Sequence, residues 1–257
     1  MQDNIFIVTG AASGIGDATA RQLADRGHKV ISLDIREPTA NVTDHYQCDL
    51  SDPISIDKVI AKLHGSYRSL VNVAGVPGSV GDELTLRVNI LGLRYLTTSI
   101  WDNITDGGSV VSISSIAGNN WRKRREFISS MLDDNDFEAA LNWWRKNHEK
   151  CSTDAYTLSK EAVVMYTMQQ AGIGMARGIR VNDVAPGPVE TPILPDFTEA
   201  VGSNTMAQMT SATNRTAQPE DIAQALVMLA ESQVGWINGQ HIIVDGGLSA
   251  GFSAGWA

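Results

Sequence analysis

The sequence lacks the features that mark several classes of protein. Only two cysteines, Cys48 and Cys151, occur in 257 residues, which is too few for a disulfide framework. No apolar run has the length of about 20 residues that a membrane-spanning helix needs. The first residues, MQDNIFIVTG, do not show the charged and then apolar pattern of a secretory signal. The five histidines show no metal-ligand spacing. We therefore expect a cytoplasmic protein with no metal ion and no membrane partner.

Basic residues are also scarce. The chain has 20 Lys and Arg against 29 Asp and Glu, a formal charge of −9, and a pI near 5.0. An acidic chain of this kind argues against nucleic acid or an anionic membrane as the main partner. The basic run 122–125 is short, and we interpret it as a solvated helix end. Linkers and internal repeats are absent as well, so we expect a single domain over 1–257.

Short apolar runs alternate with helical patterns along the chain. The runs fall at 5–8, 29–34, 69–73, 109–113, 179–184 and 240–244, with a weaker candidate at 45–48. Between them, apolar residues recur at helical spacing, as at Ala20, Leu23, Ala24 and Gly27. This alternation predicts an α/β fold with one doubly wound parallel sheet of about seven strands and helices on both faces.

A glycine-rich turn follows the first predicted strand and opens the first predicted helix. The turn residues of interest are Gly10, Ser13, Gly14, Ile15 and Gly16. Glycine lets the backbone approach a phosphate closely, and the helix start offers free N–H groups to it. The second strand ends in Asp34, whose carboxylate can accept hydrogen bonds from ribose hydroxyls. This context predicts dinucleotide binding. Asp34 would repel the 2′-phosphate of NADP and therefore favours NAD, while Arg36, two residues on, acts in the opposite direction. By itself, Asp34 could also be an ordinary turn residue at a strand end.

The stretch STDAYTLSK places Tyr156 and Lys160 four positions apart, and this spacing puts both side chains on one helix face. A phenol beside an ammonium group can transfer a proton. The best candidate to hold a substrate oxygen beside them is Ser115 in SISSIAG, which lies 156 − 115 = 41 residues before the tyrosine. Each residue alone also has a plainer interpretation, as a chance pair or a hydrogen-bonding residue at a strand end.

Several motifs in order resemble those of the short-chain dehydrogenase/reductase family. Thr9 precedes a Gly-x-x-x-Gly-x-Gly turn, and NVAG at 72–75, VNILG at 88–92 and PGPVETP at 186–192 follow. Val73 is a departure, because the family has a second asparagine there. The resemblance covers nearly the whole chain and implies a Rossmann-type fold and hydride transfer with a nicotinamide cofactor.

The resemblance also implies a role for individual residues. Tyr156 would be the general base in alcohol oxidation and the general acid in ketone reduction, while Lys160 would lower its pKa and hold the nicotinamide ribose. Ser115 would position the reacting oxygen, and Asn89 would anchor a water in a proton relay. Further cofactor contacts are implied at Asp49, Leu50, Asn72, Ala74, Gly75, Pro186, Gly187, Val189 and Thr191.

Two subgroups of the family look most similar. Segments such as APGPVETPIL (185–194) and WINGQHIIVDGGLSA (236–250) resemble bacterial coniferyl alcohol dehydrogenases, and the long gap before Tyr156 resembles 3α-hydroxysteroid dehydrogenase/carbonyl reductases. We therefore expect an NAD-dependent alcohol dehydrogenase for a bulky apolar alcohol or ketone, with aryl-allylic alcohols first and hydroxysteroids second. The rival is a non-catalytic NAD-sensing protein, which would not need the proton-transferring residues.

The gap before Tyr156 is about 28 residues longer than is usual in the family, and a structureless loop of that length is uncommon in a compact domain. Over 119–152, Ile128, Met131 and Leu132 share a helical face, and Phe137, Ala140, Leu141 and Trp144 recur at helical spacing. These patterns predict an inserted helical hairpin.

Tryptophans of the insert have two possible roles. Trp121, Trp143 and Trp144 either line a substrate pocket or hold the insert to the body, and the apolar stripe favours the second role for Trp144. A flexible lid is expected at 193–217. Because the insert would obstruct one interface used in the family, we expect a homodimer formed through 219–231 and 240–244.

Overall fold

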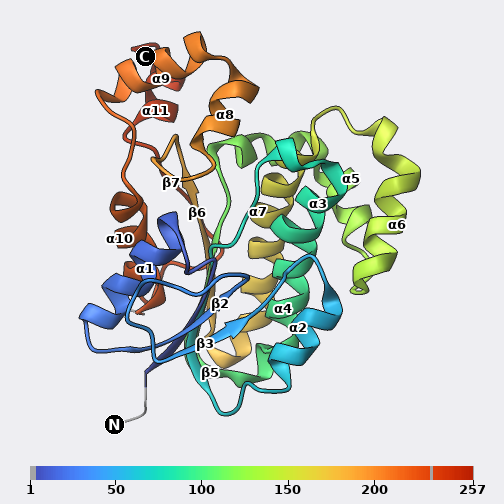
Figure 1. The fold of residues 1–257 in the computed structure, drawn as a ribbon. Helices are drawn as coiled ribbons and strands as arrows, with labels where there is room; N and C mark the ends of the chain where they lie inside the picture. Colours follow the sequence, from blue (N-terminus) through green and yellow to red (C-terminus); the bar gives the residue numbers. More distant parts are fainter. Residues whose placement is uncertain (1–3, 232–233, 257) are drawn as a thin grey trace.

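A computed structural model describes residues 4–231 and 234–256 of the chain. Seven parallel strands form one sheet in the order β3-β2-β1-β4-β5-β6-β7, with helices on both faces (Figure 1). The strands are β1 (Ile5–Thr9), β2 (Lys29–Asp34), β3 (Asp44–Gln47), β4 (Tyr67–Asn72), β5 (Ile104–Ile113), β6 (Arg180–Pro186) and β7 (His241–Val244). This architecture confirms the predicted fold class. The strand order reverses between β1 and β4, and such a switch point opens a crevice at the carboxyl ends of the strands.

Helices follow most of the strands. They are α1 (Gly14–Asp25), α2 (Pro53–Ile60), α3 (Asp82–Leu86), α4 (Leu93–Ser99), α5 (Arg125–Met131), α6 (Phe137–Asn147), α7 (Ala155–Gly174), α8 (Leu194–Val201), α9 (Ser203–Thr213), α10 (Pro219–Ala230) and α11 (Leu248–Ala254). A π-helical turn, η2 (Arg87–Gly92), joins α3 to α4, and a 3₁₀ segment, η4 (Ile116–Arg124), follows β5. Within the described residues, no helix combines the length and apolarity needed to cross a membrane.

The two faces of the sheet carry separate apolar cores. On one face, Val8 packs with Leu23 of α1 and Leu226 of α10. On the other face, Ile7 packs with Ile56 of α2 and with residues of α4 and α7. Successive side chains of a strand point to opposite faces, so the neighbours Ile7 and Val8 enter different cores. Burial of an aliphatic side chain of this size contributes about 1.5–3 kcal/mol to folding.

The insert contains two helices, α5 and α6, which lie beyond α3 and α7 (Figure 1). Asp136 caps α6, because its carboxylate accepts a hydrogen bond from the Ala139 N–H at 2.7 Å. Ile128 of α5 and Trp144 of α6 join a third apolar core with Leu158 of α7. The predicted helical hairpin is therefore confirmed. Trp144 is a packing residue, as its place on the apolar stripe indicated.

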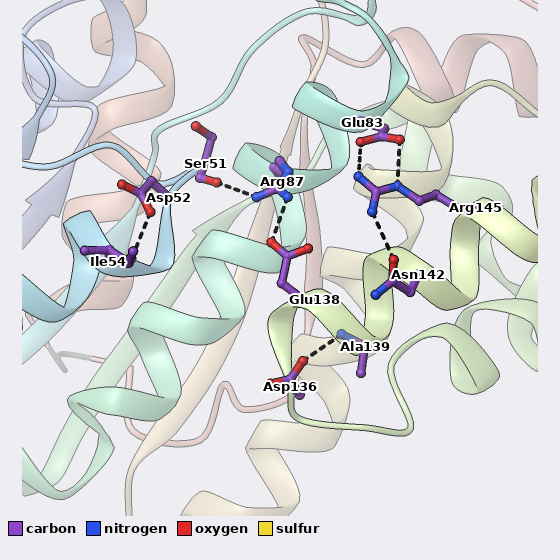
Figure 2. A network of polar contacts seen from close by, with 10 residues as sticks. All are labelled: Ser51, Asp52, Ile54, Glu83, Arg87, Asp136, Glu138, Ala139, Asn142 and Arg145. Atoms are coloured by element: carbon purple, nitrogen blue, oxygen red, sulfur yellow. Dashed lines mark hydrogen bonds and ion pairs between the residues drawn. The ribbon is translucent and has the colours of Figure 1, made fainter.

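Ion pairs attach α6 to α3 and η2. Figure 2 shows Arg145 donating to both carboxylate oxygens of Glu83, at 2.8 and 2.5 Å. Arg87 donates from Nη2 to Glu138 at 2.7 Å and from Nη1 to the Ser51 carbonyl at 2.9 Å (Figure 2). Arg87 thus connects the insert to the loop after β3. Since these pairs are solvent-exposed, they orient α6 more than they stabilise it.

Replacement of Trp144 by alanine is expected to lower the free energy of unfolding by about 3–5 kcal/mol, because it empties a large volume in a packed core. The side chain is 7 % exposed and packs in the third core. Glu83→Gln, which weakens an exposed ion pair of the same insert, should cause a much smaller loss. Urea unfolding followed by circular dichroism measures both changes. Equal losses would mean that ion pairs, rather than apolar burial, hold the insert.

The segment expected to form a lid, 193–217, is largely helical. It contains α8 and α9, which meet at Gly202. Asp196 of α8 accepts a hydrogen bond of 2.5 Å from Ser79, which lies in the turn after β4. The contact holds α8 across the carboxyl end of the sheet. The flexibility predicted for this segment stays a prediction.

Candidate active site

A cleft of about 520 Å³ lies at the carboxyl ends of the strands. The glycine turn and Asp34 form one part of it, and Ser115, Tyr156 and Lys160 form another. The predicted site residues in its lining are Gly10, Ser13, Gly14, Ile15, Gly16, Asp34, Asp49, Leu50, Ala74, Gly75, Ser115, Tyr156, Lys160, Pro186, Gly187, Val189 and Thr191. Asn72 and Asn89 are buried outside this lining. The fold therefore brings together residues between Gly10 and Phe197 that lie far apart in the sequence.

The glycine turn has no room for larger residues. Gly10 has φ +69°, and a Cβ on it would lie 2.8 Å from the Ala74 Cα. A Cβ on Gly16 would lie 2.0 Å from the Gly10 carbonyl oxygen. The turn thus packs tightly while the start of α1 faces the cleft, and free N–H groups at a helix start bind phosphate. These residues fit the pyrophosphate of a dinucleotide.

Asp34 ends β2 at the edge of the cleft. Its Oδ2 accepts a hydrogen bond from the Ala12 N–H at 3.0 Å, and its Oδ1 accepts one from the Arg36 N–H at 2.9 Å. The Arg36 guanidinium reaches back to donate to the Ser13 hydroxyl at 3.0 Å. The carboxylate is therefore fixed beside the phosphate turn, with lone pairs left for a ribose. The Arg36 side chain also belongs to the lining of the cleft.

Thr9 joins the glycine turn to the end of β4. Its hydroxyl accepts hydrogen bonds from the backbone N–H groups of Val73 and Ala74, at 3.0 and 3.1 Å. Asn72 donates to Thr97 of α4 at 3.0 Å. The departure at Val73 leaves this arrangement intact, because that residue contributes its backbone N–H.

Tyr156 and Lys160 lie in the first turns of α7. Asp154 caps this helix, accepting a hydrogen bond from the Thr157 N–H at 2.8 Å. Lys160 Nζ lies 5.7 Å from the centre of the Tyr156 ring and donates to the Ile113 carbonyl at 3.4 Å. The helical spacing thus sets a cation beside the phenol, as the sequence predicted.

Burial changes the acidity of both groups. It raises the pKa of Tyr156, and a hydrogen bond with Ser115 acts in the opposite direction. Burial lowers the pKa of Lys160 to about 8, against the opposing influence of the Asp183 charge. An ammonium with a pKa in this range can exchange protons near neutral pH. The three side chains form a group capable of proton transfer.

Asn89 lies in the π-helical turn η2. Its Oδ1 accepts a hydrogen bond from the Val76 N–H at 2.8 Å, and its Nδ2 donates to the Val76 carbonyl at 3.0 Å and to Ser159 at 3.2 Å. A Cβ on Gly75 would lie 3.3 Å from Asn89 Oδ1 and 3.6 Å from Lys160 Nζ, so glycine keeps this space open. The amide thus links the turn after β4 to α7. Sequence reasoning missed Val76, because its contribution comes from the backbone.

Apolar side chains complete the lining of the cleft. They are Val76, Leu84, Val88, Ile116, Pro188, Ile193, Leu194 and Phe197. The last three belong to the segment 193–217 that was expected to form a lid. None of the lining comes from 119–152, so Trp121 and Trp143 do not line this cleft. Leu84 and Val88 gave no sequence signal, because an isolated apolar residue on a short helix looks like any core residue.

Comparison with family models matches two parts of the chain. Residues 4–126 match the model described as short chain dehydrogenase, and residues 146–249 match one described as enoyl-(acyl carrier protein) reductase. The unmatched residues between them, 127–145, fall in the insert.

Similar proteins extend over the whole chain. Coniferyl-alcohol dehydrogenase of a Pseudomonas species is 36 % identical over 249 residues, covering 95 % of this chain and 96 % of that protein. The 3-alpha-hydroxysteroid dehydrogenase/carbonyl reductase of Comamonas testosteroni is 26 % identical, covering 96 % and 97 % of the two chains. A crystal structure of 3-alpha-hydroxysteroid dehydrogenase from Pseudomonas sp. B-0831, complexed with NADH, superimposes with a TM-score of 0.82 at 26 % identity, covering 98 % of this chain and 99 % of that one.

Proposed function

Because the chain belongs to the short-chain dehydrogenase family, we propose that it is an NAD(H)-dependent alcohol dehydrogenase and ketone reductase. We propose that residues 1–257 work as one domain with a bulky, apolar alcohol as substrate. The observation that carries the proposal is a single cleft in which a phosphate-binding turn and the Ser115–Tyr156–Lys160 group share one space with apolar walls. The comparisons establish that the protein is an oxidoreductase of this family.

Nicotinamide would supply the hydride acceptor for alcohol oxidation. The Ser115 hydroxyl would hold the alcohol oxygen, and the Tyr156 phenolate would take its proton. The Lys160 ammonium would stabilise that phenolate, which lowers the pKa of the phenol when substrate is bound. Asn89 would keep the turn at Val76 in place and hold a water next to Lys160. In ketone reduction, the same groups would return the proton.

The cofactor would lie along the cleft. Its pyrophosphate would meet Gly10, Ser13, Gly14, Ile15 and Gly16, its adenosine ribose would meet Asp34, and its adenine would lie between Asp49 and Leu50. Its nicotinamide half would contact Ala74, Gly75, Tyr156, Lys160, Pro186, Gly187, Val189 and Thr191. Asn72, which was expected to contact the cofactor, is buried outside the lining and would instead support the turn after β4 through Thr97. The fit of the glycine turn and the position of the Asp34 carboxylate support this placement.

A coniferyl-alcohol-like substrate is the first candidate. The relative of that name is 36 % identical along nearly the whole chain, and the apolar side chains in the lining of the cleft suit the aromatic ring of such an alcohol. A hydroxysteroid is the second candidate, which the similarity to the NADH-bound hydroxysteroid dehydrogenase favours. A non-catalytic NAD-sensing protein is the rival, although a sensor would not need the Ser115–Tyr156–Lys160 group.

A screen of NAD reduction at 340 nm over aryl-allylic, terpenoid and steroidal alcohols tests the proposal. Coniferyl alcohol should give the highest kcat/KM of the panel. A protein that binds NADH tightly but oxidises no alcohol and reduces no ketone in the panel would instead be a sensor. The cytoplasmic location stays a prediction, which cell fractionation tests.

We also propose a homodimer through α10 and β7. The insert packs against α4 and α7 through the third apolar core, so these helices are not open to a second chain on that side. Met228 of α10 and Ile243 of β7, in contrast, expose 39 % and 43 % of their surface. β7 ends the described sheet at one edge. An exposed apolar surface beside a sheet edge suits association of two chains.

Ile243→Asp is expected to shift the protein from dimer to monomer, because it places a charge in the apolar interface. Light scattering across a range of concentrations measures the mass. Ile54→Asp, at a position that is 62 % exposed on α2, is the matched control and should leave the dimer intact. A wild-type tetramer joined through α4 and α7 would contradict the proposed assembly.

A further inference from the structure

Ser115 lies at the start of a segment that has little support of its own. It follows β5 by two positions and caps η4, accepting a hydrogen bond from the Ala117 N–H at 3.1 Å. η4 runs for nine residues as a 3₁₀ helix, although the hydrogen bonds of this helix type are poorly aligned and runs longer than three or four residues are uncommon. The position of the Ser115 hydroxyl therefore depends on contacts that other parts of the chain make with its neighbours.

The residue before it, Ser114, is anchored to β6. Ser114 is buried, and its backbone N–H donates to the Val184 carbonyl at 2.9 Å. Its hydroxyl donates a hydrogen bond to Asp183 Oδ1 and lies 3.4 Å from His241 Nδ1. Asp183 is fully buried, so its carboxyl group keeps a fixed place within the sheet. The end of β5 is thus tied to the neighbouring strand just before Ser115.

His241 of β7 extends this anchor to the segment after Ser115. The register of β6 against β7 places it beside Asp183, and its Nδ1 lies 2.6 Å from Asp183 Oδ1. Its Nε2 lies 2.8 Å from the Oδ1 of Asn119, which belongs to η4. The bridge does not depend on the charge of the imidazole, because the Asn119 amide can turn its oxygen or its NH₂ group toward Nε2 to suit the tautomer. One imidazole therefore connects the end of β5, through Asp183, with η4.

η4 also lies against α7. A Cβ on Gly118 would lie 3.0 Å from the Lys160 carbonyl oxygen, so the segment approaches the helix as closely as a glycine allows. α7 thus supports η4 at Gly118, and His241 supports it at the next residue. Loss of the His241 contact would therefore loosen η4 beside the helix that carries the phenol.

We propose that the pair formed by Asp183 and His241 is a clamp that positions the Ser115 hydroxyl from both sides. The two clamp residues lie outside the lining of the cleft, so they are positioning residues that act through Ser115. The proposal deepens the proposed function and rests on it for the reaction, since Ser115 would hold the alcohol oxygen. A displacement of about 1 Å at such a group lowers turnover by up to about 100-fold.

The test removes the contacts of the clamp by degrees. His241→Phe keeps a ring and removes both hydrogen bonds, whereas Asn119→Ala removes only the contact with η4. We expect kcat for alcohol oxidation to fall at least about tenfold in the first variant and about fivefold in the second. The NADH dissociation constant, measured by fluorescence, should stay near the wild-type value, because the glycine turn and Asp34 lie on other strands. Asn120→Ala, at the exposed neighbouring position, is the matched control and should retain turnover.

A double-mutant cycle separates positioning from a general loss of structure. If the clamp acts through Ser115, adding His241→Phe to Ser115→Ala should lower kcat by less than about twofold, because the group that the clamp positions is already absent. A purely structural role would give the same further loss in both backgrounds. A full further loss would therefore overturn the proposal, as would an unchanged kcat in both single variants or equal losses in the Asn119 and Asn120 variants. If His241→Phe does not fold, Asn119→Ala takes its place in the cycle.

Crystal structures of the wild type and of Asn119→Ala give a measurement that needs no turnover. The Ser115 hydroxyl should move by more than about 0.5 Å relative to the Tyr156 hydroxyl, a displacement large enough to spoil a catalytic geometry. An unmoved Ser115 hydroxyl would overturn the proposal. A wild type that turns over no alcohol would refute the proposed function, while this comparison of structures would still decide the present inference.

Discussion

Replacement of Tyr156 by phenylalanine is expected to lower turnover by a factor of at least about 100, because it removes the proton-transferring hydroxyl. NADH affinity and the free energy of unfolding should stay close to those of the wild type, since the ring still occupies its place on α7. Steady-state kinetics with the best alcohol from the screen, fluorescence titration with NADH and urea unfolding measure the three quantities.

Tyr166→Phe is the matched control for this experiment. Tyr166 lies on the same helix, ten positions on, and its hydroxyl is 3.4 Å from that of Thr98, away from the cleft lining. The control should retain turnover near the wild-type value. Near-normal turnover of the Tyr156 variant, or an equal loss in both variants, would rule out Tyr156 as the general acid and base.

The wild type is expected to use NAD about 100-fold more efficiently than NADP, because the Asp34 carboxylate accepts ribose hydroxyls and repels a 2′-phosphate. Asp34→Asn keeps an acceptor for the Ala12 N–H and removes the charge, so the preference should fall at least about tenfold. The ratio of kcat/KM for the two cofactors is the measurement.

Arg36 supplies the control for the cofactor experiment. Its guanidinium donates a hydrogen bond to the Ser13 hydroxyl. From this position, it would attract the 2′-phosphate of a bound NADP. Arg36→Ala should lower the efficiency with NADP and leave that with NAD nearly unchanged. Equal or better efficiency of the wild type with NADP would show that this cation outweighs the carboxylate.

The sheet was predictable because parallel strands are buried on both faces and appear as continuous apolar runs. The run 29–34 coincides with β2, and 5–8 falls within β1. The start of β5 was missed. It begins at Ile104, while the predicted run began at 109, because polar and glycine residues lie between and the pairing with β4 is irregular there. Strand ends depend on neighbouring strands, which local sequence does not describe.

The site was predictable to the extent that its residues lie in local motifs. Tyr156 and Lys160 lie about one helical turn apart, and Gly10 and Gly16 lie six positions apart where β1 leads into α1, so spacing alone relates the members of each pair. The pairing of Asp183 with His241 joins residues 58 positions apart and depends on the register of β6 against β7. The contacts of Asn89 with Val76 likewise depend on a π-helical turn, which no residue pattern marked. Such contacts need the three-dimensional structure.

The long connection between Ser115 and Tyr156 also has a consequence for folding. Closing a connection of 41 residues instead of about a dozen increases the entropic cost of closure by only about 1 kcal/mol. The insert offsets this through its own apolar contacts, which form between residues close in sequence. Contacts between residues distant in sequence form slowly. During refolding, α5 and α6 can therefore pair early, whereas Ser115 should meet Tyr156 late, and recovery of NADH binding should lag behind recovery of helical circular dichroism.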